Sequence, residues 1–207
     1  MKEGDVLEPE FYLRNDVVAV ARDLLGKVLV TVSQGVLTSG IITETEAYQG
    51  VTDRASHASG GRFTQRTEVM YRNGGTAYVY LCYGIHSLFN VVTNRNGIPH
   101  AVLIRSIVPY SGIETMLARV GKKAPAKDMG NGPGKVSKLL GIHYNISGLP
   151  LTDNGKDDDR TNDFLIRIEQ GPTTPEKNDI EVSTRIGVDY AGDDAFLPFR
   201  FRYKKSL

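Results

Sequence analysis

The alternation of apolar and polar residues predicts a chain rich in β-strands. Residues 27–32 and 36–48 are apolar stretches rich in Val, Ile and Thr, and the short Ser-Gln-Gly turn between them predicts an antiparallel pair. Further stretches have the composition or alternation of strands: 77–82, 87–93, 100–108, 164–169 and 199–203. The sequence shows no internal repeat and no linker, so its 207 residues predict one domain spanning 1–207.

Apolar residues at helical spacing predict three short helices. Asp16 is placed to cap the first helix, and Gly26 is placed to stop it. The second helix is predicted over 113–120. The third has Pro133 in its first turn and Gly141 at its end, where each residue type is favourable.

The connections between these elements are uneven in length. Residues 49–75 are rich in Gly, Ser, Thr, Arg and Asn, and a segment this long is more often functional or disordered than a simple connection, so we predict a functional loop. A solvated loop is predicted over 146–163, which contains three consecutive aspartates at 157–159. Tyr83 falls in the turn 83–86 between two strands, so we expect it at a hairpin tip, projecting into solvent.

One predicted strand carries two carboxylates. Alternation places Glu44, Glu46 and Tyr48 on the same face. Glu46 lies in an otherwise apolar or hydroxyl-bearing stretch, which makes it a candidate general base for water, with Glu44 as a rival and an exposed strand glutamate as the alternative. Arg105 interrupts another apolar strand and needs an anionic partner; Glu46 is the natural one, and a structural ion pair elsewhere is the alternative.

Aromatic residues near these positions suggest a flat pocket. Tyr48, His57 and Tyr80 are candidate walls, because aromatic faces stack on heterocycles and attract cationic rings. Core packing is the alternative for all three and is preferred for Tyr78. Tyr83 at a turn is a candidate wedge for a base stack, with an ordinary surface tyrosine as the alternative.

Two other polar residues lie in apolar strands. Asn90 must find hydrogen-bond partners among its neighbours. Cys82 is the single cysteine, so it forms no intramolecular disulfide, and a buried small hydrophobic residue is expected there.

Charge is unevenly distributed along the chain. The net charge is only +1, but residues 54–145 hold 12 basic and 3 acidic side chains, whereas 146–194 hold 5 basic and 12 acidic. This split suggests one surface suited to phosphates, with ordinary solvated surface as the alternative. The run from Gly130 to Lys135 leads into a predicted helix, a placement that suits anion binding, although it lacks the spacing of a nucleotide-binding P-loop.

The sequence predicts neither a metal site nor a membrane segment. His86, His100 and His143 are isolated, and no metal-binding spacing of Cys and His occurs, so no metal and no cofactor are expected. The N-terminal residues lack the apolar core of a signal peptide, and no apolar run is long enough to cross a bilayer. We therefore expect a cytoplasmic protein.

Taken together, these residues resemble the alkyladenine (3-methyladenine) DNA glycosylases that lack a helix-hairpin-helix, in particular the bacterial type. The resemblance extends from about residue 24 to residue 203 and is densest in these motifs: Thr45-Glu46-Ala47-Tyr48, His57 with Gly60-Gly61-Arg62, Tyr78-Val79-Tyr80, Tyr83-Gly84, Asn90, Leu103-Ile104-Arg105, Gly132-Pro133 with Lys135, and Arg185-Ile186-Gly187-Val188. It implies one compact α+β domain built on a curved antiparallel sheet, partly open and barrel-like, flanked by short helices. The longer N-terminal segment of the animal members is absent from this sequence.

The resemblance also implies a role for each matched residue. Glu46 would activate a water molecule and Arg105 would help hold the nucleotide. The remaining matches fall into three groups: Tyr48, His57, Tyr80, Asn90 and Ile186 around a flipped base; Tyr83 in the space that the base vacates; and Lys135, Arg62 and Lys138 against backbone phosphates.

The implied function is that of a monofunctional DNA glycosylase, which releases alkylated or deaminated purines such as 3-methyladenine, 7-methylguanine, hypoxanthine and ethenoadenine. Water would be the nucleophile and an abasic site the product, without strand cleavage. The expected partners are duplex DNA with a damaged purine and a catalytic water, and a monomer is expected. A non-catalytic module that binds damaged DNA and a nucleoside hydrolase are the alternatives.

Overall fold

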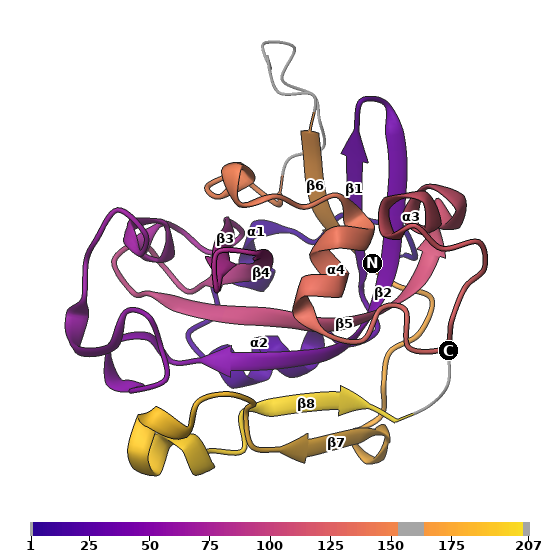
Figure 1. Cartoon of the computed structure of the whole chain (residues 1–207). Helices are drawn as coiled ribbons and strands as arrows, with labels where there is room; N and C mark the ends of the chain where they lie inside the picture. The colour runs from indigo at the N-terminus through magenta and orange to yellow at the C-terminus, as the bar shows by residue number, and fades with distance from the viewer. Residues whose placement is uncertain (1, 153–163, 205–207) are drawn as a thin grey trace.

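The structure is a computed structural model and describes residues 2–152 and 164–204, which form a curled antiparallel sheet with a few short helices around it (Figure 1). The sheet order is β3-β4-β5-β2-β1-β6, and β8 pairs with both β2 and β7. The strands are β1 (Val28–Ser33), β2 (Val36–Tyr48), β3 (Ala77–Cys82), β4 (His86–Thr93), β5 (His100–Ser111), β6 (Phe164–Glu169), β7 (Ile180–Ser183) and β8 (Arg200–Tyr203). The α-helices are α1 (Pro9–Tyr12), α2 (Val17–Asp23), α3 (Ile113–Val120) and α4 (Pro133–Leu140). The expected α+β class and curved antiparallel sheet are confirmed.

The long strand β2 organises the sheet. One edge of β2 pairs with β5 along most of its length, while the other edge pairs first with β1 and then, from Glu44 to Glu46, with β8. The pairing of β2 with β5 is irregular on both sides of Glu44, where a bulge interrupts the register. A bulge bends a strand and increases its twist, so the sheet curves at the position of the carboxylates.

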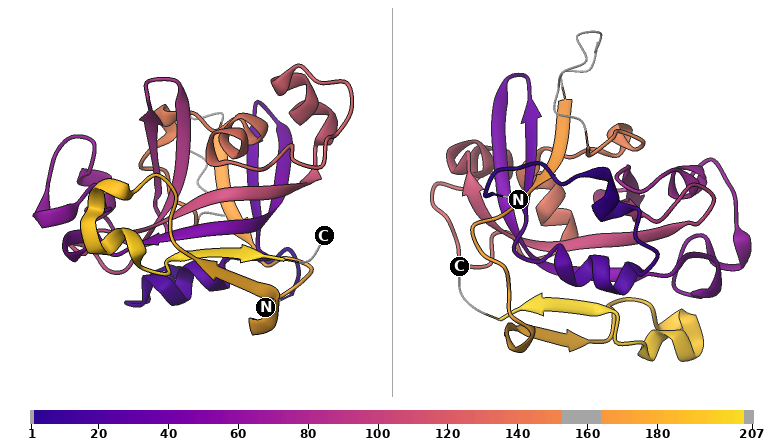
Figure 2. Two further views of the ribbon diagram at one scale, coloured as in Figure 1. Left: turned by 60° about the horizontal axis from the view of Figure 1, so that its bottom comes forward. Right: turned by 180° about the vertical axis from the view of Figure 1, so that it is seen from behind.

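Helices cover both sides of this sheet. Figure 1 shows α4 in front of β5, and the rear view in Figure 2 shows α2 on the opposite side. Thr45 Oγ1 donates a hydrogen bond of 2.8 Å to the carbonyl of Ala21 in α2, so the side chain of Thr45 faces that helix. Because side chains alternate along a strand, Glu46 faces the other side of the sheet.

The helix ends follow the sequence signals. The Asp16 side chain accepts a hydrogen bond of 2.9 Å from the backbone of Ala19 and caps α2. Pro133 starts α4, and Gly141 ends it with a φ of +67°, a conformation that suits glycine. These three predictions are confirmed, whereas α2 ends at Asp23, with Leu24 as its C-cap, shortly before the predicted stop at Gly26.

Several elements differ from the predictions. The expected strand over 100–108 continues to Ser111, and both α1 and β7 were missed because they are too short for a periodic pattern to show. Residues 49–75 contain three short 3₁₀ turns. Buried Ala58, Val69 and Met70 anchor this segment against Tyr78 of β3. The predicted loop 146–163 falls partly, with its three aspartates, outside the described residues.

Candidate active site

A cavity of about 320 Å³ opens on the side of β2 that faces away from α2. Its lining includes seven of the residues to which the resemblance assigned a role: Tyr48, His57, Tyr80, Tyr83, Asn90, Arg105 and Ile186. These residues come from β2, the loop after β2, β3, the turn after β3, β4, β5 and the segment after β7. The fold therefore gathers residues from distant parts of the sequence around one cavity.

Glu46 lies directly behind the cavity wall and is fully buried. Its Oε1 accepts a hydrogen bond of 2.8 Å from the backbone N–H of Ile186. Its Oε2 accepts one of 2.8 Å from the Tyr48 hydroxyl and one of 3.2 Å from Arg105 Nη1. All three donors line the cavity, so the carboxylate is held in one orientation at the edge of the space.

Arg105 joins the two carboxylates of β2. Its Nε donates to Glu44 Oε1 at 3.2 Å, in addition to the bond from Nη1 to Glu46. Glu44 also accepts hydrogen bonds from Arg200 Nε at 2.6 Å and from Ser106 Oγ at 3.1 Å. The predicted contact of Arg105 with Glu46 is confirmed. Arg200 and Ser106, which also hold Glu44, lie outside the cavity lining, whereas all three donors to Glu46 lie within it.

Tyrosine and histidine rings form the walls of the cavity. The His57 and Tyr80 rings meet edge to face, with their centroids 4.6 Å apart. Tyr78 is buried as expected, and its hydroxyl also contacts His57 Nδ1 at 2.8 Å. Burial and the neighbouring carboxylate of Glu46 raise the pKa of Tyr48 well above its usual value, so Tyr48 remains a hydrogen-bond donor to Glu46 at neutral pH.

The imidazole of His57, which forms part of the cavity wall, is uncharged at neutral pH. Burial, followed by the positive charges of Arg66 and Arg62, lowers the pKa of His57 to about 4. An imidazole with this pKa carries no charge at neutral pH. The cavity therefore presents uncharged aromatic rings on this side.

Tyr83 stands at the rim of the cavity and is 92% exposed. It lies in the turn between β3 and β4, where both Tyr83 and Gly84 have positive φ angles, of +51° and +70°. Such angles favour a tight reversal of the chain, and they place the tyrosine ring outside the sheet. Its predicted position at a hairpin tip is confirmed.

Asn90 and Cys82 also line the cavity. Asn90 Nδ2 donates to the carbonyls of Tyr78 and Leu88, at 3.2 Å each, so the buried amide has the partners that the sequence required. The expectation of a buried Cys82 is wrong: the residue is only half-buried, because it ends β3 at the cavity rather than in the core.

The segment that carries Ile186 is fixed by a buried ion pair between Arg185 and Asp53. The guanidinium of Arg185 forms two hydrogen bonds with the Asp53 carboxylate and donates to the carbonyls of Ala47 and Asp194. It also lies 4.9 Å from the centre of the Tyr48 ring. Burial alone would lower the pKa of Arg185, but the bonds and charge of Asp53 outweigh burial and raise it.

Comparison with known proteins identifies the family. Residues 10–207 match the family model described as methylpurine-DNA glycosylase. A protein of Chlamydia abortus is 46% identical over 201 residues, covering 95% of this chain and 97% of its own. A protein of Bacillus cereus strain ATCC 10987 is 43% identical over 201 residues, covering 95% of this chain and 94% of its own. Each is named as a candidate 3-methyladenine DNA glycosylase.

The chain belongs to the methylpurine-DNA glycosylase family. It is therefore a DNA N-glycosylase, an enzyme of DNA repair that acts on alkylated bases.

The glycosylase has several basic residues near the cavity. Lys135 and Lys138 are exposed on α4, whose first residue, Pro133, lines the cavity; Arg62 is exposed on the loop after β2. Lys135 Nζ is paired at 3.0 Å with Asp128 Oδ2. The phosphate contacts of these three residues remain predictions.

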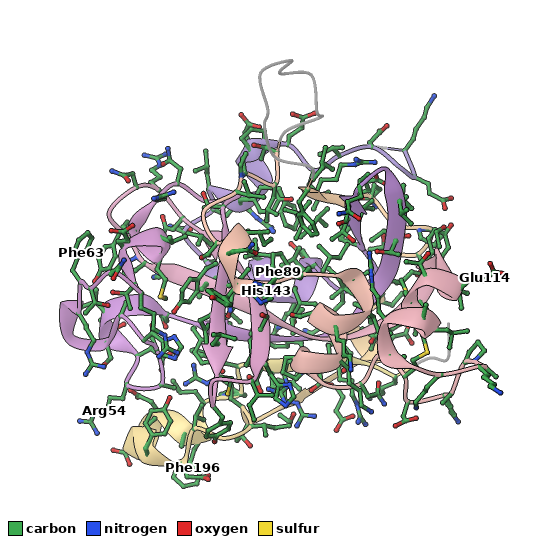
Figure 3. All side chains as sticks on the ribbon, turned by 45° about the horizontal axis from the view of Figure 1, so that its top comes forward. Arg54, Phe63, Phe89, Glu114, His143 and Phe196 are labelled. Atoms are coloured by element: carbon green, nitrogen blue, oxygen red, sulfur yellow. The ribbon has the colours of Figure 1, made fainter. Side chains whose placement is uncertain are left out.

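Sequence reasoning gave no role to several residues that line the glycosylase cavity or support it from behind. Asp53 and Arg185 are one example, and their buried ion pair leaves no periodic signal in the sequence. Tyr190 and Met70 also line the cavity, from segments where no regular element was predicted. Figure 3 shows Arg54 and Phe196 projecting at the same corner of the molecule, where the Arg54 backbone donates to Asp194 Oδ2. Only the folded chain brings these two loops together.

Within residues 2–152 and 164–204 of the glycosylase, no three His, Cys, Asp or Glu side chains form a group suited to a metal ion. No helix in the same ranges is long and apolar enough to cross a membrane.

Proposed function

We propose that this enzyme turns a methylated purine, 3-methyladenine above all, out of duplex DNA into the aromatic cavity and hydrolyses its N-glycosidic bond. The observation that supports this most strongly is the buried Glu46 carboxylate, which is held against the cavity wall by Arg105, Tyr48 and the backbone of Ile186. Both relatives described above are named for 3-methyladenine. 7-Methylguanine, hypoxanthine and ethenoadenine are further candidate substrates of the same cavity.

The cavity suits a flat cation. Purines alkylated on a ring nitrogen carry a positive charge, and the π faces of Tyr48 and Tyr80 attract such rings. The adjacent His57 is uncharged at neutral pH and adds no repulsion. Asn90 is placed to discriminate between purines by their exocyclic groups, because its amide lines the cavity.

Hydrolysis then needs one water molecule and one base. The water oxygen bonds to the sugar carbon, the N-glycosidic bond breaks, and its electron pair neutralises the departing purine cation. The proton from water passes to Glu46, whose negative charge also favours the oxocarbenium-like sugar of the transition state. Arg105 orients the carboxylate through its bond to Oε2.

The expected product is an abasic site in an intact strand. Strand cleavage by a glycosylase requires an amine that forms a Schiff base with the sugar. Among the described residues that line the cavity, none is a lysine, so water remains the nucleophile.

Replacing Glu46 with Gln tests this mechanism. The amide keeps the size of the side chain but cannot accept the proton, so we expect single-turnover release of 7-methylguanine from duplex DNA to fall at least about 1,000-fold. Binding to the same duplex should change little. Release from free methylated nucleosides, measured in parallel with the wild-type enzyme, tests the nucleoside-hydrolase alternative.

Two further variants complete this experiment. Glu181→Gln changes an exposed carboxylate on β7 and should leave release unchanged. Glu44→Gln should reduce release much less than Glu46→Gln, because Glu44 contacts the cavity only through Arg105. Near-normal turnover of Glu46→Gln, or a larger loss in Glu44→Gln, would overturn the assignment of the base.

A further inference from the structure

Arg66 contacts two walls of the base cavity from behind. Its Nη2 lies 3.2 Å from His57 Nε2, and its guanidinium carbon lies 4.7 Å from the centre of the Tyr80 ring. Arg66 and Tyr80 also line a second cavity, of about 440 Å³. Within the described chain, Tyr80 is the one residue that lines both cavities, so Arg66 covers the ring face that points away from the base site.

These contacts determine the protonation of His57. A guanidinium has only donors, so His57 Nε2 must be the acceptor in its contact with Arg66. The proton of the neutral ring then sits on Nδ1, which donates to the Tyr78 hydroxyl at 2.8 Å. Both ring nitrogens are therefore occupied by protein groups, so the His57 side chain offers a base only its aromatic ring and no free nitrogen.

We propose that Arg66 is a positioning residue that fixes His57 in its Nδ1-protonated form and adds to the effect of burial in keeping the ring neutral, so that the cavity accepts purines carrying a positive charge. This inference rests on the proposed function, because it concerns the base that enters the same cavity. Arg66 places its own charge on the outer face of Tyr80, whereas a protonated His57 would place a charge at the cavity wall. Like charges in contact would weaken the binding of a cationic purine.

The surroundings of His57 support this electrostatic role. Tyr78 and Tyr80 face it from β3, and Arg62 and Arg66 from its own loop. Tyr48, Arg105 and Tyr190 line the same cavity. After burial, Arg66 is the largest cause of the lowered His57 pKa.

The first test is a titration of His57 by NMR in wild type and in Arg66→Met, with His57→Gln used to assign the signal. The methionine keeps an apolar stem but removes the donor and the charge. We expect a midpoint of about 4 in the wild type and a midpoint higher by about one pH unit or more in Arg66→Met. Arg66→Lys restores the charge, so its His57 midpoint should lie between those of Arg66→Met and the wild type.

The second test compares two leaving bases. Release of 7-methylguanine, a cation, and of hypoxanthine, a neutral base, is measured from duplexes between pH 5 and 8. For each base, the rate of Arg66→Met is divided by the rate of the wild type. With a His57 midpoint of about 5 in Arg66→Met, about half of the rings are neutral at pH 5, against about nine tenths in the wild type. The ratio for 7-methylguanine should therefore fall about twofold between pH 8 and 5, while the ratio for hypoxanthine should not.

Arg72→Met is the matched control, because Arg72 lines the same second cavity but pairs with Glu68, at 3.7 Å. It should leave both the His57 midpoint and the release ratios unchanged.

An unchanged His57 midpoint in Arg66→Met, or an equal loss for both bases at every pH, would overturn the role of Arg66. A wild-type enzyme that releases no base from any duplex would instead refute the proposed function, and the titration needs no DNA, so the two failures can be told apart.

Discussion

Single residues of this enzyme combine a sequence signal with an unusual environment. Glu46 is predicted as a candidate base from the polar alternation of one strand, yet its complete burial and its three donors depend on chain segments far from it. Tyr83 is the opposite case, a large ring left almost entirely in solvent. Each is costly in isolation, and the proposed binding of an extruded base would account for both.

Replacing Tyr83 with Ala tests whether its ring acts as a wedge in the base stack of the duplex. The exposed ring makes little contribution to the folded protein, so the melting temperature should be unchanged. Release of 7-methylguanine from duplex DNA should fall about tenfold or more, because stacking on a base contributes about 1 to 3 kcal/mol. Tyr83→Phe keeps the stacking surface and should restore most of the rate.

Tyr110→Ala is a suitable control for Tyr83→Ala, since Tyr110 is an exposed tyrosine of β5 outside the cavity lining. The wedge model also requires duplex DNA to be affected more than single-stranded DNA, where no stack needs to be held open. Equal losses on the two forms of DNA would contradict it.

Among the elements, β2 does most to assemble the site. Its strand pattern is evident in the sequence, but its bulge with β5 and its change of partner from β1 to β8 are not. These features bring Arg200 of β8 and Arg105 of β5 to the same carboxylate of Glu44. Register irregularities follow from competition among neighbouring strands, so local sequence does not determine them.

The loop after β2 and the segment after β7 are joined by the buried pair of Asp53 and Arg185. Replacing Asp53 with Ala would leave the guanidinium buried without its partner. We expect the free energy of unfolding, measured by urea denaturation, to fall by about 3 to 5 kcal/mol. Base release should also slow, because Arg185 precedes the backbone N–H that contacts Glu46.

Glu181→Ala provides the comparison, because it breaks an ion pair with Arg202 in which both side chains are about half exposed. Such a pair contributes less than about 1 kcal/mol. If the two variants lose the same stability, the buried pair does not hold these segments together.

For the whole molecule, the division of charge along the sequence leads to a prediction about DNA binding. Lys135 is exposed in the first turn of α4, next to Pro133 at the cavity. Replacing Lys135 with Met should lower the slope of log affinity against log salt concentration by about one, as expected for one lost phosphate contact. The exposed ion pair with Asp128 costs little to exchange for a phosphate.

Lys177→Met is the control for the salt experiment, since Lys177 lies in the acidic part of the sequence, just before β7. Its slope should equal that of the wild type. Equal slopes for wild type and Lys135→Met would remove Lys135 from the phosphate contacts.

The sequence alone determined every described strand except β7, the three helices α2, α3 and α4, the hairpin that presents Tyr83, and the set of residues that resembles a glycosylase. These are local properties, because periodicity, capping and turn chemistry act over a few neighbouring residues. The tertiary structure decided how far Glu46 is buried, the pairing of Arg185 with Asp53, the exposure of Cys82 and the position of Arg66 behind Tyr80. Each of these depends on segments that are distant in the chain, and their contacts arise only when the sheet curls and closes around the cavity.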